Sequence, residues 1–83
     1  MTPGTSRDLY GESKQLAEAL RVRGEPEAAQ RVEDAIDGGS TSSEILFSLR
    51  REFDRLLDRG AGGDAELAAW IADLRNAVDK ALE

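Results

Sequence analysis

Cysteine and histidine are both missing from this chain of 83 residues. The absence of cysteine excludes disulfide bonds and thiolate metal sites. Together the two absences remove the most familiar catalytic nucleophiles and bases, leaving carboxylates, serines and Tyr10. A domain of this size also has little volume for a substrate pocket. We therefore expect a protein that is not an enzyme and that holds no metal ion or other cofactor.

Long hydrophobic runs are missing as well. Apolar runs extend over only a few residues, whereas a membrane-spanning helix needs about 20. The N-terminal residues lack the apolar core of a secretory signal peptide. We therefore expect a cytoplasmic protein without membrane contact.

Basic residues are outnumbered by acidic ones, 11 against 17, which gives a net charge of −6 at pH 7. The excess is concentrated in two segments. Residues 25–39 hold five acidic side chains and one basic one, and residues 61–83 hold five acidic and two basic. Such a field repels nucleic-acid phosphates and favours basic partners. We expect the partner to be a protein of basic character or a second copy of the chain, and not a nucleic acid.

Apolar residues recur at helical spacing in four segments, and no segment alternates as a strand does. The pattern predicts a disordered N-terminus at residues 1–5 and helices at about residues 6–23, 26–37, 42–59 and 65–82. Glycines separate the segments, and the last break, at 60–63, is predicted to be flexible. The predicted fold is all-α: one domain, residues 6–83, of four short helices packed as antiparallel hairpins in a small helical bundle.

The turn between the second and third segments carries the clearest local signal. Gly38 and Gly39 predict the left-handed backbone that ends a helix. Thr41 and Glu44 have the spacing of a capping box, which predicts a helix start. Asp64 is predicted to cap the fourth helix in a similar way.

The large apolar residues on the four helical stripes make up the predicted core. They are Leu9, Leu16, Leu20, Val32, Ile36, Ile45, Leu46, Leu49, Phe53, Leu56, Leu57, Leu67, Ile71, Leu74, Val78 and Leu82. On the second helix Ala28, Ala29 and Ala35 join the stripe. Small residues there let a neighbouring helix come close. A core of this size leaves a chain of 83 residues marginally stable, so self-association would help it.

Phe47 does not fit the apolar stripe of the third helix. At about 100° per residue it points well away from that stripe, toward a face that carries charged residues. An aromatic side chain among charges is typical of an interface anchor. Alternatively, the third helix is buried on two sides or Phe47 tucks under the preceding turn, because aromatic residues are usually buried. Trp70, at the edge of the fourth helix's stripe, is the second candidate anchor.

Charged residues provide the remaining candidates for partner binding. Arg51 and Arg55 lie on one basic ridge with Arg59, since arginines recur there every four residues. One interpretation of the ridge is docking to an acidic surface, and the other is pairing with carboxylates of the chain itself. Glu33, Asp34 and Asp37 form an acidic cluster suited to a basic partner. These carboxylates would bind a divalent cation only if more oxygens converged on them, so no metal site is predicted.

A helix-turn-helix motif is a further interpretation of the second and third helices. Ala35, Gly39 and Ile45 have the required spacing. However, Ser40 and Ser48 stand where the motif needs apolar side chains, and the second helix is acidic although it would lie near the DNA backbone.

Two stretches, Ala28–Ile36 and Gly38–Arg50, resemble small, mostly uncharacterised bacterial helical proteins, some of which are similar to immunity proteins that neutralise a co-encoded toxin. The resemblance covers about residues 16–57. It implies a stoichiometric inhibitor with no chemistry of its own.

The sequence thus favours a small acidic module for protein–protein interaction. Its most specific form is an immunity- or antitoxin-like inhibitor. The acidic second and fourth helices would meet a basic partner, with Phe47 or Trp70 as the apolar anchor. The alternatives are a structural homo-oligomer, such as a homodimer, and a DNA-binding regulator.

Overall fold

The computed structural model describes residues 8–82, except the side chains of residues 61 and 62. Four α-helices and one short 3-10 helix follow each other without a strand in this part of the chain. They are α1 (Leu9–Val22), α2 (Pro26–Asp37), α3 (Ser42–Asp58), η1 (Gly60–Gly63) and α4 (Ala65–Ala81). The predicted all-α class is confirmed. The disordered segment predicted at residues 1–5 lies outside the described residues.

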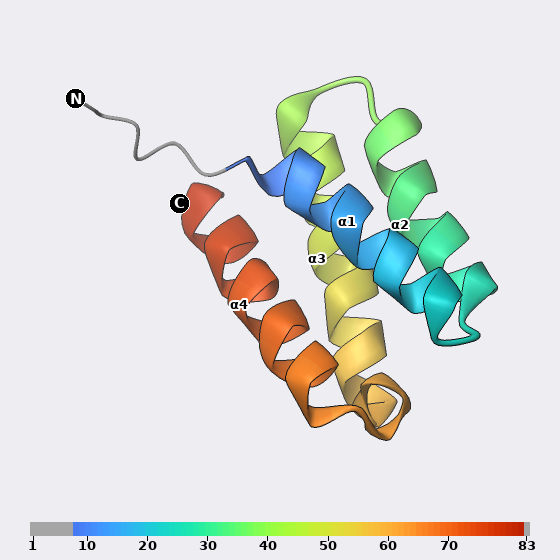
Figure 1. Ribbon diagram of the computed structural model, residues 1–83. Helices are drawn as coiled ribbons and strands as arrows, with labels where there is room; N and C mark the ends of the chain where they lie inside the picture. The colour runs from blue at the N-terminus through green and yellow to red at the C-terminus, as the bar shows by residue number, and fades with distance from the viewer. Residues whose placement is uncertain (1–7, 83) are drawn as a thin grey trace.

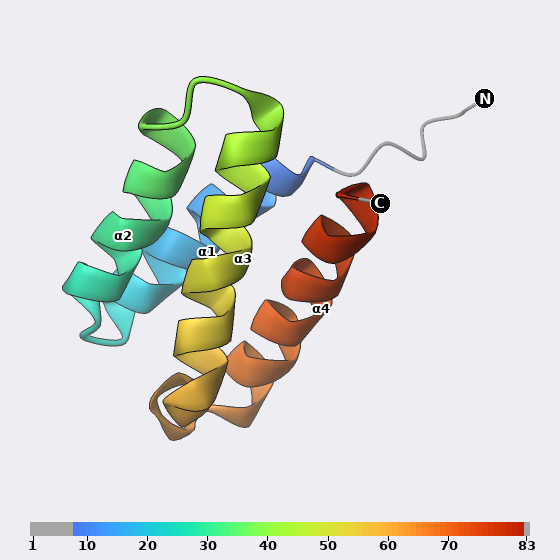
Figure 2. The same ribbon diagram turned by 180° about the vertical axis from the view of Figure 1, so that it is seen from behind.

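The chain runs up and down through the bundle, so that consecutive helices form antiparallel hairpins (Figure 1). Helix α1 packs against α2, α2 against α3 and α3 against α4, and contacts between α1 and α4 close the arrangement. Seen from behind, α3 lies between α2 and α4 with α1 on its far side (Figure 2). One face of α3 is therefore left without a helix of the described chain over it.

The core contains every large apolar residue that the helical stripes predict. Ten of the sixteen are buried, and the other six are partly buried and pack against these ten. Phe53 of α3 is the largest fully buried side chain. Four alanines, Ala17 on α1 and three on α2, are buried with them, which indicates close approach of helix backbones.

Side-chain caps start three of the helices. The Asp8 carboxylate accepts the Gly11 N–H at 2.9 Å, so α1 begins at Leu9 and not near residue 6. Thr41 and Asp64 cap α3 and α4 as predicted. The Glu44 carboxylate differs from a capping box, because it accepts the hydroxyls of Ser40 and Thr41 in place of a backbone N–H.

The left-handed backbone predicted at Gly38 and Gly39 is wrong. Gly38 has a right-handed backbone, with φ −89°, and Gly39 does not have a positive φ. Both positions need glycine for a different reason, close approach. A Cβ on Gly38 would lie 2.8 Å from the Asp34 carbonyl oxygen, and one on Gly39 would overlap the Ile45 side chain. The segment 60–63 separates α3 from α4 as predicted and forms the short 3-10 helix η1.

Candidate functional site

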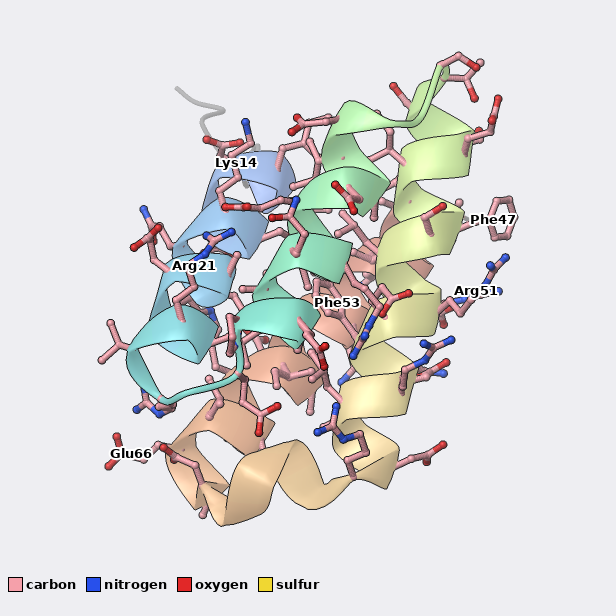
Figure 3. All side chains as sticks on the ribbon, turned by 90° about the vertical axis from the view of Figure 1, so that its right-hand side faces the viewer. Lys14, Arg21, Phe47, Arg51, Phe53 and Glu66 are labelled. Atoms are coloured by element: carbon pink, nitrogen blue, oxygen red, sulfur yellow. The ribbon has the colours of Figure 1, made fainter. Side chains whose placement is uncertain are left out.

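The exposed face of α3 carries the most unusual apolar residue of the structure. The Phe47 side chain keeps 50% of its surface exposed, whereas every large apolar residue of the predicted core is buried or packs against the buried cluster. Figure 3 shows Phe47 and Arg51 projecting outward from α3, while Phe53 points into the bundle. Phe47 is therefore neither a core residue nor tucked under the preceding turn, and the alternative in which it is buried is wrong.

Arg50 contacts the exposed ring. Its guanidinium carbon lies 5.4 Å from the centroid of Phe47, which is within the range of a cation–π contact. The same guanidinium donates to Asp79 of α4 at 2.6 Å. The helical spacing already places Arg50 on the same face as Phe47, since residues three apart on a helix are neighbours. Phe47 is therefore exposed and in contact with an arginine.

Arg51 and Arg55 differ from the other arginines. Both are exposed, and neither has a carboxylate partner among residues 8–82. The remaining arginines of the described chain all form ion pairs; they are Arg21, Arg23, Arg31, Arg50, Arg59 and Arg75. Arg51 and Arg55 follow Phe47 at intervals of four residues and so continue its row along the helix. We call Phe47, Arg50, Arg51 and Arg55 the α3 face.

The acidic candidates on α2 are partly neutralised inside the bundle. Glu33 accepts two hydrogen bonds from the Arg21 guanidinium of α1, at 2.7 and 2.5 Å. Asp34 accepts from Gln30 of the same helix at 2.9 Å. Asp37 is exposed and forms no hydrogen bond or ion pair with the described residues. Only part of the acidic cluster is therefore free to meet a partner.

The Arg21–Glu33 pair predicts a pH-dependent contribution to stability. Hydrogen bonds from Arg21 lower the pKa of Glu33 below its usual range, against the opposing effect of desolvation. Because this folded-state pKa is depressed, the stabilisation is present above the usual glutamate pKa and is lost as pH falls through the folded value. We expect Glu33→Gln to lower Tm at pH 7, and the difference from wild type to shrink as pH falls below the usual glutamate range and through the depressed folded-state pKa.

Thermal melts by circular dichroism between pH 7 and pH 3 measure this difference. Glu27→Gln is the matched control, because Glu27 is an exposed carboxylate on the same helix that forms no ion pair with the described residues. The control should change Tm less than Glu33→Gln does at pH 7. A Glu33→Gln deficit that persists unchanged at pH 3 would contradict the assignment.

Trp70 does not join the α3 face. It lies on α4, is half-buried and packs against the core. Of the predicted site residues, the structure thus brings together Phe47, Arg51 and Arg55 on one helix face. It leaves the α2 carboxylates and Trp70 on other helices.

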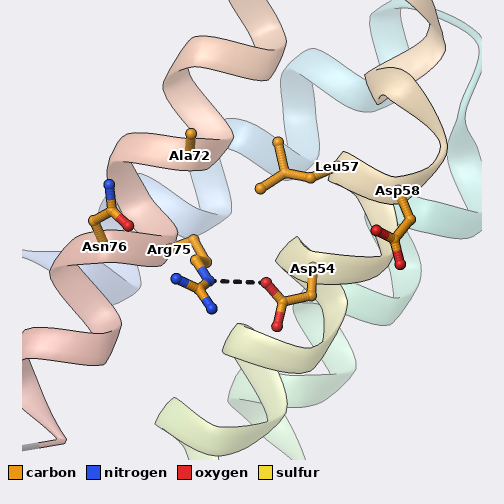
Figure 4. A pocket seen from close by; sticks show the side chains of 6 residues that line it. All are labelled: Asp54, Leu57, Asp58, Ala72, Arg75 and Asn76. Atoms are coloured by element: carbon orange, nitrogen blue, oxygen red, sulfur yellow. Dashed lines mark hydrogen bonds and ion pairs between the residues drawn. The ribbon is translucent and has the colours of Figure 1, made fainter.

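A surface groove of about 510 Å³ lies between α3 and α4. Leu57 and Ala72 provide its apolar lining, and Asp54, Asp58, Arg75 and Asn76 provide its polar lining. Figure 4 shows Arg75 of α4 turned toward Asp54 of α3, with Nε 2.8 Å from Oδ1. This ion pair joins the two helices, so the polar groups of the groove serve the packing of α3 on α4.

Residues 8–82 contain no group of three or more histidine, cysteine or acidic residues placed to hold a metal ion. The Ser13 hydroxyl is fully buried on α1 and has no hydrogen-bond partner in the described chain. It therefore lacks both access to a substrate and a base that could activate it. Within the same residues, no helix combines the length and the apolar character needed to cross a membrane.

Helices α2 and α3 lie side by side and run in opposite directions in both ribbon views (Figures 1 and 2). In a helix-turn-helix the two helices cross at about 90–120°. The geometry of this pair is thus that of an antiparallel hairpin and gives no support to the DNA-binding interpretation.

Comparisons with protein-family models, with curated proteins and with solved structures found no match to this chain. The resemblance to immunity proteins therefore stays a prediction, and function has to be argued from the site itself.

Proposed function

We propose that this protein is a non-enzymatic protein-binding module and that the α3 face is its binding surface. The observation that carries the proposal is the half-exposed ring of Phe47. An exposed aromatic side chain beside arginines has the composition of an interface hot spot, where aromatic residues and arginine dominate the binding energy.

The packing of the bundle does not require an aromatic side chain at position 47. Its core is filled by residues that point inward from all four helices, and the ring contributes little to that packing because half of its surface remains exposed. The cation–π contact with Arg50 favours one orientation of the ring, and such a preference lowers the conformational entropy that an anchor loses on binding. An immunity- or antitoxin-like inhibitor is one specific form that such a module would take.

The test compares how variants of the full chain capture proteins from a lysate of the source organism. We expect Phe47→Ser to reduce recovery of a specific partner by at least about tenfold, the loss typical of a hot-spot residue. The captured proteins are quantified by mass spectrometry. Circular dichroism melts check that the variant remains folded.

Val22→Ser is the matched control, since Val22 is an apolar residue with 82% of its surface exposed, on α1. This variant should recover the partner at the wild-type level. Equal recovery by wild type and Phe47→Ser would contradict the proposal. Equal loss in both variants would also contradict it, because the binding would then be a general effect of apolar surface.

A further inference from the structure

The unpaired arginines are not scattered over the surface. Carboxylates are abundant in the chain, with 17 acidic side chains against 11 basic ones. Six of the described arginines form an ion pair with a carboxylate. The two exceptions, Arg51 and Arg55, lie one and two helical turns beyond the exposed Phe47 on the same side of α3. The exposed aromatic ring and the two unpaired guanidinium groups thus form one continuous strip.

We propose that the α3 face binds an acidic amphipathic segment of the partner protein. An apolar side chain of that segment covers Phe47, and its carboxylates pair with Arg51 and Arg55. The inference rests on the proposed function and specifies the partner's chemistry. Arginine suits this role because its planar guanidinium can hold a carboxylate through two hydrogen bonds.

The positions of the chain's own carboxylates support an acidic partner for the α3 face. Sequence analysis predicts a basic partner for the acidic helices, but several of their carboxylates already pair with arginines of the chain, such as Glu25 with Arg59 and Asp79 with Arg50. Beside Phe47, the Glu44 carboxylate accepts the Ser40 and Thr41 hydroxyls. Asp58, which forms no ion pair with the described residues, lies one turn beyond Arg55, at the end of the strip far from Phe47.

Two other classes of binding partner, nucleic acid and a second copy of the chain, fit this strip less well. Nucleic acid would meet two free arginines on a chain with a net charge of −6, which repels phosphates at longer range. A second copy of the chain would place the same surface on both sides of a two-fold axis. An axis through the middle of the strip would set Arg51 of one copy against Arg51 of the other.

The experiment uses two synthetic helical peptides with the same apolar row, one flanked by glutamates and the other by lysines. Fluorescence anisotropy at low ionic strength measures their affinity for the full chain. We expect the glutamate peptide to bind about tenfold more tightly than the lysine peptide, because two exposed ion pairs contribute on that order. The Arg51→Glu/Arg55→Glu double variant should reverse this preference.

The double variant Lys14→Glu/Lys80→Glu is the matched control. It changes the net charge by the same amount at two exposed lysines that form no ion pair with residues 8–82, so it should keep the preference for the glutamate peptide. A preference retained by Arg51→Glu/Arg55→Glu, or equal or absent binding of the two peptides to wild type, would overturn the inference. Tighter binding of an oligonucleotide, or a Phe47-dependent dimer in light scattering, would overturn it in favour of those occupants.

The failures of the two proposals are distinguishable. If Phe47→Ser abolishes capture of the partner and Arg51→Glu/Arg55→Glu leaves it unchanged, the binding surface is correct and its charge assignment is wrong. If Phe47→Ser has no effect on capture, the proposed function itself fails.

Discussion

Replacing Phe53 by alanine is expected to lower the free energy of unfolding by about 3–5 kcal/mol. Phe53 is the largest fully buried side chain of the bundle, and it lies on α3, which packs against both α2 and α4. The substitution removes a buried ring and leaves a cavity that neighbouring helices fill only in part. A domain of this length has a total stability of about 4–12 kcal/mol, so the variant loses a large share of it. Urea denaturation followed by circular dichroism measures the change.

Phe47→Ala is the matched control for this prediction. It makes the same chemical change on the same helix, but at a ring that is half exposed. We expect it to cost less than about 1 kcal/mol, because exposed positions contribute little to stability. Similar losses in the two variants would contradict the division of α3 into a buried face and a binding face.

The parts of the fold that sequence analysis predicted correctly depend on short-range signals. The helical stripes have a period that involves only neighbouring turns, and the caps at Thr41 and Asp64 involve residues three positions apart. These interactions form within one helix, so the sequence contains all the information that determines them. The short turns then leave little choice but antiparallel packing.

The glycine turns show where local signals were insufficient. A pair of glycines is typical of a left-handed helix end, yet the backbone at Gly38 is right-handed. Position 38 requires glycine because the Asp34 carbonyl comes too close for a Cβ atom. Position 39 requires glycine because the Ile45 side chain comes too close. The Gly39 requirement depends on how α2 turns into α3, which propensities of single residues do not specify.

The charge pairs of the site could not be predicted for a related reason. Periodicity placed Arg51, Arg55 and Arg59 on one ridge, but it did not say which of them would meet a carboxylate. Arg59 reaches Glu25, 34 residues earlier in the chain, because the end of α3 lies near the start of α2. Arg51 and Arg55 are exposed and pair with no carboxylate of the described residues. The direction of a side chain follows from the helix, but its partner follows from the packing of the other helices.

The second large effect is expected from Ala29→Leu, which should destabilise the bundle by about 1–3 kcal/mol. Ala29 has no exposed surface and lies on α2, which packs against both α1 and α3. The leucine adds three carbon atoms to a site that is already filled, so a helix must move outward or side chains must leave their preferred rotamers. For a domain of this length, each 1 kcal/mol lowers Tm by about 4–8 °C. A thermal melt by circular dichroism therefore resolves the change.

Ala69→Leu separates crowding from any effect of leucine on helix formation. Ala69 is exposed on α4, and alanine and leucine have similar helix propensities, so this variant should stay within about 0.5 kcal/mol of wild type. If Ala29→Leu were equally neutral, α2 would have room beside its neighbours and the buried alanines would not set the helix spacing. Destabilisation by Ala29→Leu alone would show that the small residues on α2 are required for close packing. That packing keeps α2 and α4 on either side of α3, and so leaves the outer face of α3 open for a partner.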